Sequence, residues 1–114
     1  MNTATLIALA EPNRLHIVEL LRERPHSVGE ITARLQLRQP QVSKHLRVLS
    51  RAGLVAARPI AQRRLYQLQP KPFVEMGVWL ATFRVTLPGR LDALEAHLQG
   101  VQAEQRSRRK RRRE

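Results

Sequence analysis

The stretch from Gln39 to Gly53, QPQVSKHLRVLSRAG, constrains the fold of this chain more than any other segment. Val42, Leu46 and Leu49 recur at spacings of four and three residues, which predicts a helix with one apolar face. Its other faces carry hydrogen-bond donors and positive charge, and no acidic residue occurs between positions 36 and 75. Such a helix can pack on a core with one face and meet an anionic surface with another.

A second, shorter helix is predicted just before this one. Ser27 followed by Glu30 is a capping-box pattern, and it predicts a helix over Val28–Leu35. After a turn of about four residues, Pro40 fits the first turn of the next helix, where its missing N–H has no intrahelical partner. Gly53 suits the left-handed residue that often ends a helix. This spacing is that of a helix-turn-helix, whose second helix can enter the major groove of DNA.

The side chains of the second helix favour DNA as its partner. The residues that lie off its apolar face are Gln39, Ser43, Lys44, Arg47 and Arg51. These residue types match phosphates and the edges of bases. An isolated basic helix is more often a solvated surface helix, but the preceding helix and turn favour DNA binding.

Two further helices are predicted before this motif. The first spans Thr3–Ala10 and is expected to bury Leu6, Ile7 and Leu9. The second begins at Pro12 and ends near Arg24. His16 and His26 are expected at the surface or at its boundary, without a ligand role.

A hairpin is predicted after the motif, with strands over Leu54–Arg58 and Arg64–Leu68. Between them, Pro59–Arg63 forms a tip that contains no glycine. Because arginines flank this tip, the hairpin can act as a wing that touches phosphate or reaches the minor groove. The alternative is a solvated turn.

The remaining pattern predicts a helix from Pro70 to about Gln99, with a kink or break after Leu87 because Pro88 follows. Its apolar stripe is too wide for a helix that only covers so small a domain from outside, which predicts a homodimer. The residues predicted at the dimer interface are Leu6, Phe73, Met76, Leu80, Phe83, Leu87, Leu91, Leu94 and Leu98.

Length and composition narrow the class of protein. The chain has 114 residues, which fits one small domain. The absence of cysteine excludes disulfides, thiolate metal sites and cysteine nucleophiles. No segment is long and apolar enough to span a membrane, and the N-terminus lacks a signal-peptide pattern. We therefore expect a cytoplasmic protein associated with the nucleoid, without a membrane partner.

The net charge of +12 is unevenly distributed along the chain. Residues 106–114 hold seven basic residues and one acidic residue, a net charge of +6, so the other +6 belongs to residues 1–105. We expect a DNA-binding and dimerisation domain over residues 1–100 and a disordered basic tail over residues 101–114. The tail is expected to add non-specific DNA affinity that falls with salt.

Three segments resemble the ArsR/SmtB family of winged-helix transcriptional repressors: IALAEPNRLHIVELL, SVGEITARLQLRQPQVSKHLRVLSRAGLV and RRLYQL. The similarity runs from about Ala4 to Leu68 and is looser in the C-terminal helix. It implies a mainly α fold with a small β-hairpin, a winged helix-turn-helix of order α-α-α-α-β-β-α, with a homodimer formed through the terminal helices. It also implies an (auto)repressor that binds an imperfect palindrome, its operator, in its own promoter region.

The resemblance places the DNA contacts at Gln39, Pro40, Ser43 and Lys44, with His45 and Arg47 nearby. The full predicted DNA-binding set is Arg38, Gln39, Pro40, Gln41, Ser43, Lys44, His45, Arg47, Arg63 and Arg64. This sequence departs from the family pattern twice. Arg38 replaces the usual serine cap, which loses roughly 1 kcal/mol but adds a group that can contact phosphate. Gln62 replaces the usual wing glycine, which leaves the conformation of the tip open.

Metal-sensing members of the family carry a Cys-x-Cys-type motif or paired Asp and His residues in the last helix. This sequence has Ser27–Glu30 at the first place and lacks the Asp-x-His pattern at the second. Because metal affinity needs several convergent ligands, we expect no metal sensor and no cofactor. The chain is more similar to the non-metal SdpR-type members, and the sequence does not identify its inducer.

Two other classes of protein are alternatives to the repressor. A non-specific architectural DNA-binding protein would need only the basic charge, whereas Gln39, Ser43 and Lys44 are base-reading types. An enzyme is not expected, because no carboxylate pair, Ser/His/Asp set or phosphate-binding glycine loop occurs in the sequence.

Overall fold

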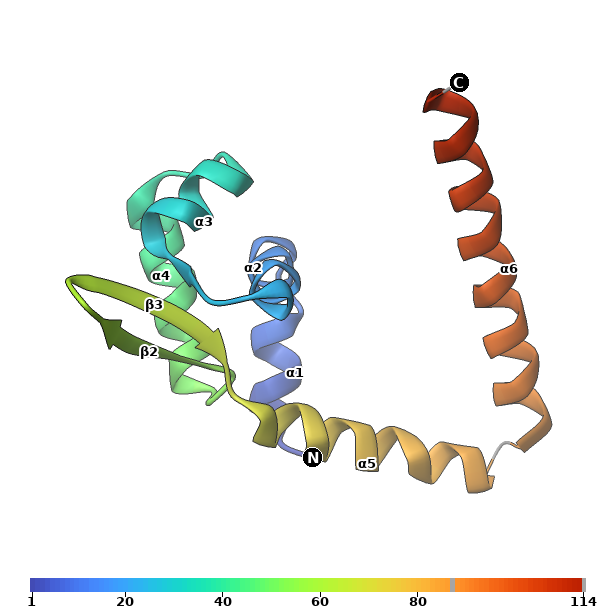
Figure 1. The fold of residues 1–114 in the computed structure, drawn as a ribbon. Helices are drawn as coiled ribbons and strands as arrows, with labels where there is room; N and C mark the ends of the chain where they lie inside the picture. The colour runs from blue at the N-terminus through green and yellow to red at the C-terminus, as the bar shows by residue number, and fades with distance from the viewer. Residues whose placement is uncertain (87, 114) are drawn as a thin grey trace. The chain divides into compact units, whose positions relative to one another are not determined.

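The computed structural model describes residues 1–86 and 88–113. The elements are α1 (Thr3–Leu9), α2 (Pro12–Glu23), β1 (His26–Ser27), α3 (Val28–Leu35), α4 (Gln39–Arg51), β2 (Val55–Ile60), β3 (Arg63–Leu68), α5 (Pro70–Thr86) and α6 (Pro88–Arg113) (Figure 1). Met1–Met76 form one unit and the chain from Gly77 forms a second. The predicted fold class, mainly helical with a small hairpin, is confirmed.

The predicted helix-turn-helix corresponds to α3 and α4. Ser27 Oγ accepts a hydrogen bond from the backbone N–H of Glu30, and Glu30 Oε1 accepts one from the backbone N–H of Ser27, both at 3.2 Å. This capping box begins α3 at Val28, as the sequence predicted. Gln36 ends α3 in the left-handed region with a φ of 55°, which turns the chain toward α4.

The end of α4 also follows the sequence. Gly53 has a φ of 76°, so the predicted left-handed glycine is confirmed. The backbone N–H of Leu54 donates to the carbonyl oxygen of Leu49 at 3.0 Å, which closes the last turn. Leu54 itself is fully buried, so this turn leads the chain directly from α4 into the core.

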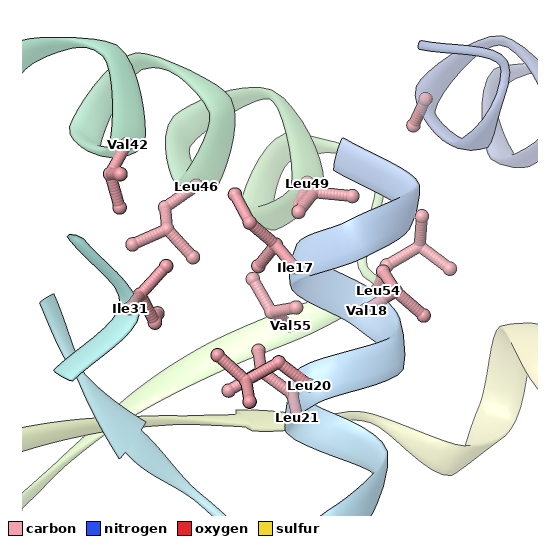
Figure 2. Packing of buried hydrophobic residues seen from close by; sticks show 11 residues of the cluster. Ile17, Val18, Leu20, Leu21, Ile31, Val42, Leu46, Leu49, Leu54 and Val55 are labelled. Atoms are coloured by element: carbon pink, nitrogen blue, oxygen red, sulfur yellow. The ribbon is translucent and has the colours of Figure 1, made fainter. Parts of the chain in front are cut away.

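The core of the first unit lies between α2, α3, α4 and the start of β2 (Figure 2). Its members are Ala8, Ile17, Val18, Leu20, Leu21, Ile31, Val42, Leu46, Leu49, Leu54 and Val55. Burying one large aliphatic side chain of this kind contributes about 1.5–3 kcal/mol. Figure 2 shows side chains from α2, α3, α4 and β2 converging, so this cluster fixes how the helix-turn-helix sits on the rest of the unit.

The buried face of α1 differs from the prediction. Thr5 and Ala8 are buried, whereas Leu6 and Ile7 are 41% and 63% exposed. Leu9 is only partly buried. Leu6 and Ile7 are therefore not buried within the single chain, contrary to the prediction, because the short helix α1 contacts α2 and α4 and buries its smaller residues Thr5 and Ala8.

The sheet has three antiparallel strands in the order β1-β3-β2. β1 is not predicted from the sequence, because a strand of two residues is too short to show alternation. His26 of β1 pairs with Tyr66 and is fully buried, so the prediction that it lies at the surface or its boundary is wrong. Its Nδ1 lies 2.7 Å from the carbonyl oxygen of Arg24.

The hairpin is longer and its tip is tighter than predicted. Ile60 pairs with Arg63, so Ala61 and Gln62 alone form the turn, and the predicted five-residue tip over Pro59–Arg63 is wrong. Ala61 takes the left-handed conformation with a φ of 57°, one residue before the position at which the family pattern has glycine. Pro59 stands within β2, which contacts only β3 in the sheet, so its missing N–H is tolerated at that edge.

The C-terminal part contains two helices. The predicted kink or break falls on Leu87, which lies outside the described residues; α5 ends at Thr86 and α6 begins at Pro88. α6 continues through Gly100 to Arg113, whereas the sequence predicted a helix end at Gly100. One glycine costs a helix only about 1 kcal/mol, and Gln, Glu and Arg after it are good helix formers. The division into a domain over residues 1–100 and a disordered tail stays a prediction.

The length and apolar character of the helices bear on membrane insertion. Within residues 1–86 and 88–113, no helix combines the length and the hydropathy that crossing a bilayer requires.

Candidate nucleic-acid interface

The two faces of α4 are separated as its sequence predicted. Val42, Leu46 and Leu49 are 0–1% exposed and belong to the core. The side chains of Lys44 and Arg47 are exposed on the same helix. Because the apolar face is fixed in the core, the basic face is held outward in a single orientation.

The N-terminus of α4 is where most of the predicted DNA-binding residues lie. Arg38, Gln39, Pro40 and Gln41 are exposed, and Ser43 is partly buried one turn further on. The first helical N–H groups of α4 lie at the same end, and such groups favour phosphate. The structure therefore gathers exposed donors of the predicted set at one end of one helix.

Gln41 has a structural role in addition to its predicted contact with DNA. Its Oε1 accepts a hydrogen bond from the backbone N–H of Arg38 at 3.1 Å. This bond supplies one half of a capping box, although Arg38 itself has no side-chain oxygen with which to cap the helix. With its oxygen engaged, Gln41 presents its amide N–H groups as donors.

His45 lies differently from its exposed neighbours. Its side chain is 17% exposed, and its Nδ1 lies 3.7 Å from Glu11 Oε2 at the start of α2. Burial raises the pKa of Glu11, but hydrogen bonds from the backbones of Arg14 and Asn13 and the nearby His45 and Arg14 charges together lower it. Glu11 therefore stays ionised beside the imidazole. The structure places His45 beside the start of α2, and its role as a DNA contact stays a prediction.

The Glu11–Arg14 segment also ties α1 to α2. Glu11 is the N-cap of α2 and accepts from the backbone N–H of Arg14 at 2.9 Å. Arg14 Nε donates to the carbonyl oxygen of Ala8 at 2.6 Å, and its Nη2 donates to that of Ile7 at 3.3 Å. A capping pattern at Glu11 could have been found in the sequence, but the bonds of Arg14 depend on how α1 packs.

The hairpin β2–β3, here called the wing, carries three exposed arginines: Arg58, Arg63 and Arg64. They do not share one environment. Arg63 Nη2 donates to Glu30 Oε1 at 2.5 Å, across 33 residues of sequence. The guanidinium of Arg64 lies over the ring of Tyr66, with its Cζ 5.8 Å from the ring centroid. No contact of Arg58 with an acidic side chain occurs within the described part of the chain.

Metal binding would require several side chains with ligand atoms close together. Where the structure describes the chain, no group of three or more His, Cys, Asp or Glu side chains is placed to hold a metal ion. The absence of a metal sensor stays a prediction from the sequence.

Known proteins match the segment that carries this surface. The profile of the arsR family of bacterial regulatory proteins matches residues 11–57. The uncharacterized HTH-type transcriptional regulator Rv0081 of Mycobacterium tuberculosis is 38% identical over 96 residues, which are 83% of this chain and 82% of the relative. The chain belongs to the arsR family. The predicted family is thereby confirmed, whereas its placement among SdpR-type members stays a prediction.

Two further proteins are similar to this arsR-family chain. The HTH-type transcriptional regulator Rv2034 of Mycobacterium tuberculosis is 49% identical over 63 residues, which span 55% of this chain and 59% of the relative. The solved structure of HlyU from Vibrio cholerae, a protein named a transcriptional activator, has a TM-score of 0.60 and 37% identity. That match covers 71% of this chain and 88% of HlyU. The family and these relatives are transcription regulators, so the prediction that the chain is not an enzyme is confirmed.

Proposed function

We propose that this arsR-family protein is a sequence-specific transcription regulator that binds DNA as a homodimer and represses from a palindromic operator, including one upstream of its own gene. The observation that carries the proposal is the fixed orientation of α4. Its apolar side chains are locked in the core, while exposed donors lie at its N-terminal end. A helix held in this way can enter the major groove with that end toward the bases.

Within this proposal, the donors at the start of α4 read the bases. The amide of Gln39 can bond both N6 and N7 of adenine, and Ser43 and Lys44 suit phosphate or guanine. Arg38, Gln41 and Arg47 are exposed around them and supply further donors. Sequence discrimination should therefore depend on Gln39, whereas Arg38 and Arg47 should act mainly through phosphate.

Dimerisation is supported by the apolar character of α5. Val74, Val78 and Leu80 are 63%, 64% and 53% exposed, and the exposed rings of Trp79 and Phe83 pack edge to face with centroids 5.1 Å apart. A helix that is apolar on most of its circumference needs another apolar surface to pack against. A second copy of the chain is the simplest source of that surface, and a symmetric dimer matches two half-sites of a palindrome.

Not every residue predicted at the dimer interface has the same environment. Phe73 packs against the core of the first unit, and Met76 is partly buried. Leu6, Leu80, Phe83, Leu94 and Leu98 are between 38% and 53% exposed. Leu87 and the side chain of Leu91 lie outside what the structure describes. The exposed group supports the interface, while Phe73 also belongs to the fold of the protomer.

The proposal is tested by DNA binding of the purified protein. The DNA upstream of its own gene and a scrambled duplex are titrated at near-physiological salt, with the full chain and with a shortened chain that ends at Gln105. Both forms should prefer the native duplex by a large factor, and the shortened chain should show a smaller dependence on salt because it lacks the basic segment. Equal binding of both duplexes, lost when the segment is removed, would instead support the architectural alternative.

The direction of regulation needs its own measurement, since HlyU is named an activator. A reporter fused to the upstream DNA should rise when the gene for this protein is deleted. A fall of the reporter would show activation and contradict the proposed repression without affecting the proposed DNA binding.

A further inference from the structure

The carboxylate of Glu30 lies where three parts of the first unit meet. Oε1 accepts from the backbone N–H of Ser27 at 3.2 Å and from Arg63 Nη2 at 2.5 Å. Oε2 accepts from Arg24 Nη1 at 3.1 Å. Glu30 stands in the first turn of α3, Arg24 ends α2, and Arg63 is the first residue of β3. One side chain therefore connects the helix-turn-helix, the segment before it and the wing.

The Arg63 contact lies beyond the point at which the third strand supports the wing. β1 pairs with β3 only as far as Ser27, which is opposite Leu65. Toward the tip, β3 continues through Arg64 to Arg63 with β2 as its strand partner. A two-stranded ribbon is marginal by itself and twists more than a wider sheet. The contact with Glu30 thus holds the section of the wing that β1 does not reach.

The environment of Glu30 makes this contact stronger than an ordinary surface ion pair. Exposed pairs contribute little, because solvent screens them and both side chains lose freedom. The side chain of Glu30 is only 29% exposed, and its two oxygens accept from three donors. The hydrogen bond from the Ser27 backbone, then that from Arg24, and also the Arg63 charge, lower the pKa of Glu30 to about 2. The carboxylate is therefore charged at neutral pH.

We infer that Glu30 is a positioning residue for DNA binding, which acts through Arg63 to hold the wing so that Arg58 and Arg64 can reach the DNA backbone. This inference rests on the proposed function. In this arrangement Arg63 supports the wing through its bond to Glu30. The phosphate contact predicted for Arg63 is then made by Arg58 and Arg64.

The effect of removing the negative charge of Glu30 on DNA affinity distinguishes this role from a purely electrostatic effect. Removing an acidic group from a protein that binds a polyanion should strengthen binding, because a repulsive term is lost. The positioning role predicts the reverse for Glu30, since the wing would lose its support. A weaker complex after loss of a negative charge is therefore the signature of this contact.

The experiment measures the affinity of the full chain for the DNA upstream of its gene and for a scrambled duplex, with Glu30→Gln, Arg63→Ala and the double variant. Glutamine at this position keeps the capping box, because its side-chain oxygen still accepts from Ser27. Each single variant should bind the native duplex roughly tenfold more weakly than the wild type. A tenfold change corresponds to a free energy within the range of couplings measured for residues in contact. The affinity of the double variant for the native duplex should be no lower than that of the weaker-binding single variant.

Glu23→Gln is the matched control, because it removes the same charge from an exposed side chain in the same unit, 62% exposed and 3.9 Å from Arg34. It should bind the native duplex as tightly as the wild type or more tightly. If Glu30→Gln proves poorly folded by thermal unfolding, Arg63→Met tests the same contact without touching the capping box, with the same expected loss.

Each remaining outcome overturns the inference in a recognisable way. Unchanged or tighter binding by Glu30→Gln, with normal discrimination by the wild type, overturns the positioning role and leaves the proposed function standing. Additive losses in the double variant show that Arg63 contacts DNA independently of Glu30. A wild-type protein that does not discriminate between the duplexes overturns the proposed function and this inference together.

Discussion

The side-chain oxygen of Gln41 accepts a hydrogen bond from the backbone N–H of Arg38 at 3.1 Å, and Arg38 has no side-chain acceptor to return the bond. The helix α4 of this protein therefore begins with half a capping box. The missing half is the one that serine usually supplies.

Arg38→Ser should complete this box. The variant should gain about 1 kcal/mol in the free energy of unfolding, seen as a rise of a few degrees in Tm by circular dichroism. The salt dependence of its affinity for operator DNA should decrease by the amount that about one phosphate contact contributes. Arg38→Ala is the control, since it should lose the same contact without the gain in stability.

Ala61→Gly should also stabilise the fold. Ala61 has a φ of 57°, and a non-glycine residue in that region costs about 1–2 kcal/mol. Glycine removes this cost. It also stabilises the unfolded chain by about 0.4–1 kcal/mol, because it increases the conformational entropy of that state. A net gain of about 0.5–1 kcal/mol should appear in urea unfolding. Gln62→Gly, at the neighbouring turn residue without a positive φ, should bring no gain.

The two faces of α4 should respond to substitution in opposite ways. Leu46→Ala should cost about 2–5 kcal/mol in the free energy of unfolding, because Leu46 is 1% exposed in the core. Gln39→Ala should leave stability within about 0.5 kcal/mol and weaken discrimination between operator and scrambled DNA by about 1–3 kcal/mol. Equal loss of affinity for both duplexes in Gln39→Ala would contradict base readout.

Stability at acid pH should depend on Glu30. The hydrogen bond from the Ser27 backbone is the main cause that lowers the pKa of Glu30 from its ordinary value of 4.5 to about 2. The unfolded chain therefore takes up a proton at higher pH than the folded one, so the contribution is complete above about pH 4.5 and is lost as the pH falls toward 2. Urea unfolding of Glu30→Gln between pH 5 and pH 2.5 should show a shallower decline than the wild type. An identical decline would mean that the carboxylate has no such role.

Leu80→Glu should convert the proposed dimer into monomers. Leu80 is 53% exposed on α5, and a buried, unpaired carboxylate at an apolar interface is costly. Light scattering coupled to size exclusion should report half the wild-type mass, and operator affinity should fall because the two half-sites are no longer linked. Glu104→Gln on α6, an exposed site, should keep the wild-type mass.

The local parts of the fold could be predicted from the sequence. The box of Ser27 and Glu30, the apolar spacing from Val42 to Leu49 and the glycine at position 53 act through neighbours a few residues away. Their geometry follows from helix periodicity and backbone preference, and the structure matches each of them.

The contacts of the candidate site that were missed join distant residues. Glu30 reaches Arg63 across 33 positions, and His45 meets Glu11 from another helix. Neither pair leaves a periodic signal, because each depends on how α2, α3 and the sheet pack together. β1 was missed for the same reason, since His26 and Ser27 become a strand only through pairing with β3.

The unbroken course of α6 has a consequence for charge density. Along an α-helix the residues advance 1.5 Å each, so the seven basic residues from Arg106 to Arg113 fall within about 12 Å of helix axis. That is roughly one positive charge per 1.7 Å, which equals the linear density of negative charge on duplex DNA. Such a helix repels itself strongly when alone and loses that repulsion beside a polyanion. Its helical form and its contact with DNA should therefore strengthen each other, whereas dissolved salt should weaken the contact with DNA and screen the repulsion within the free helix.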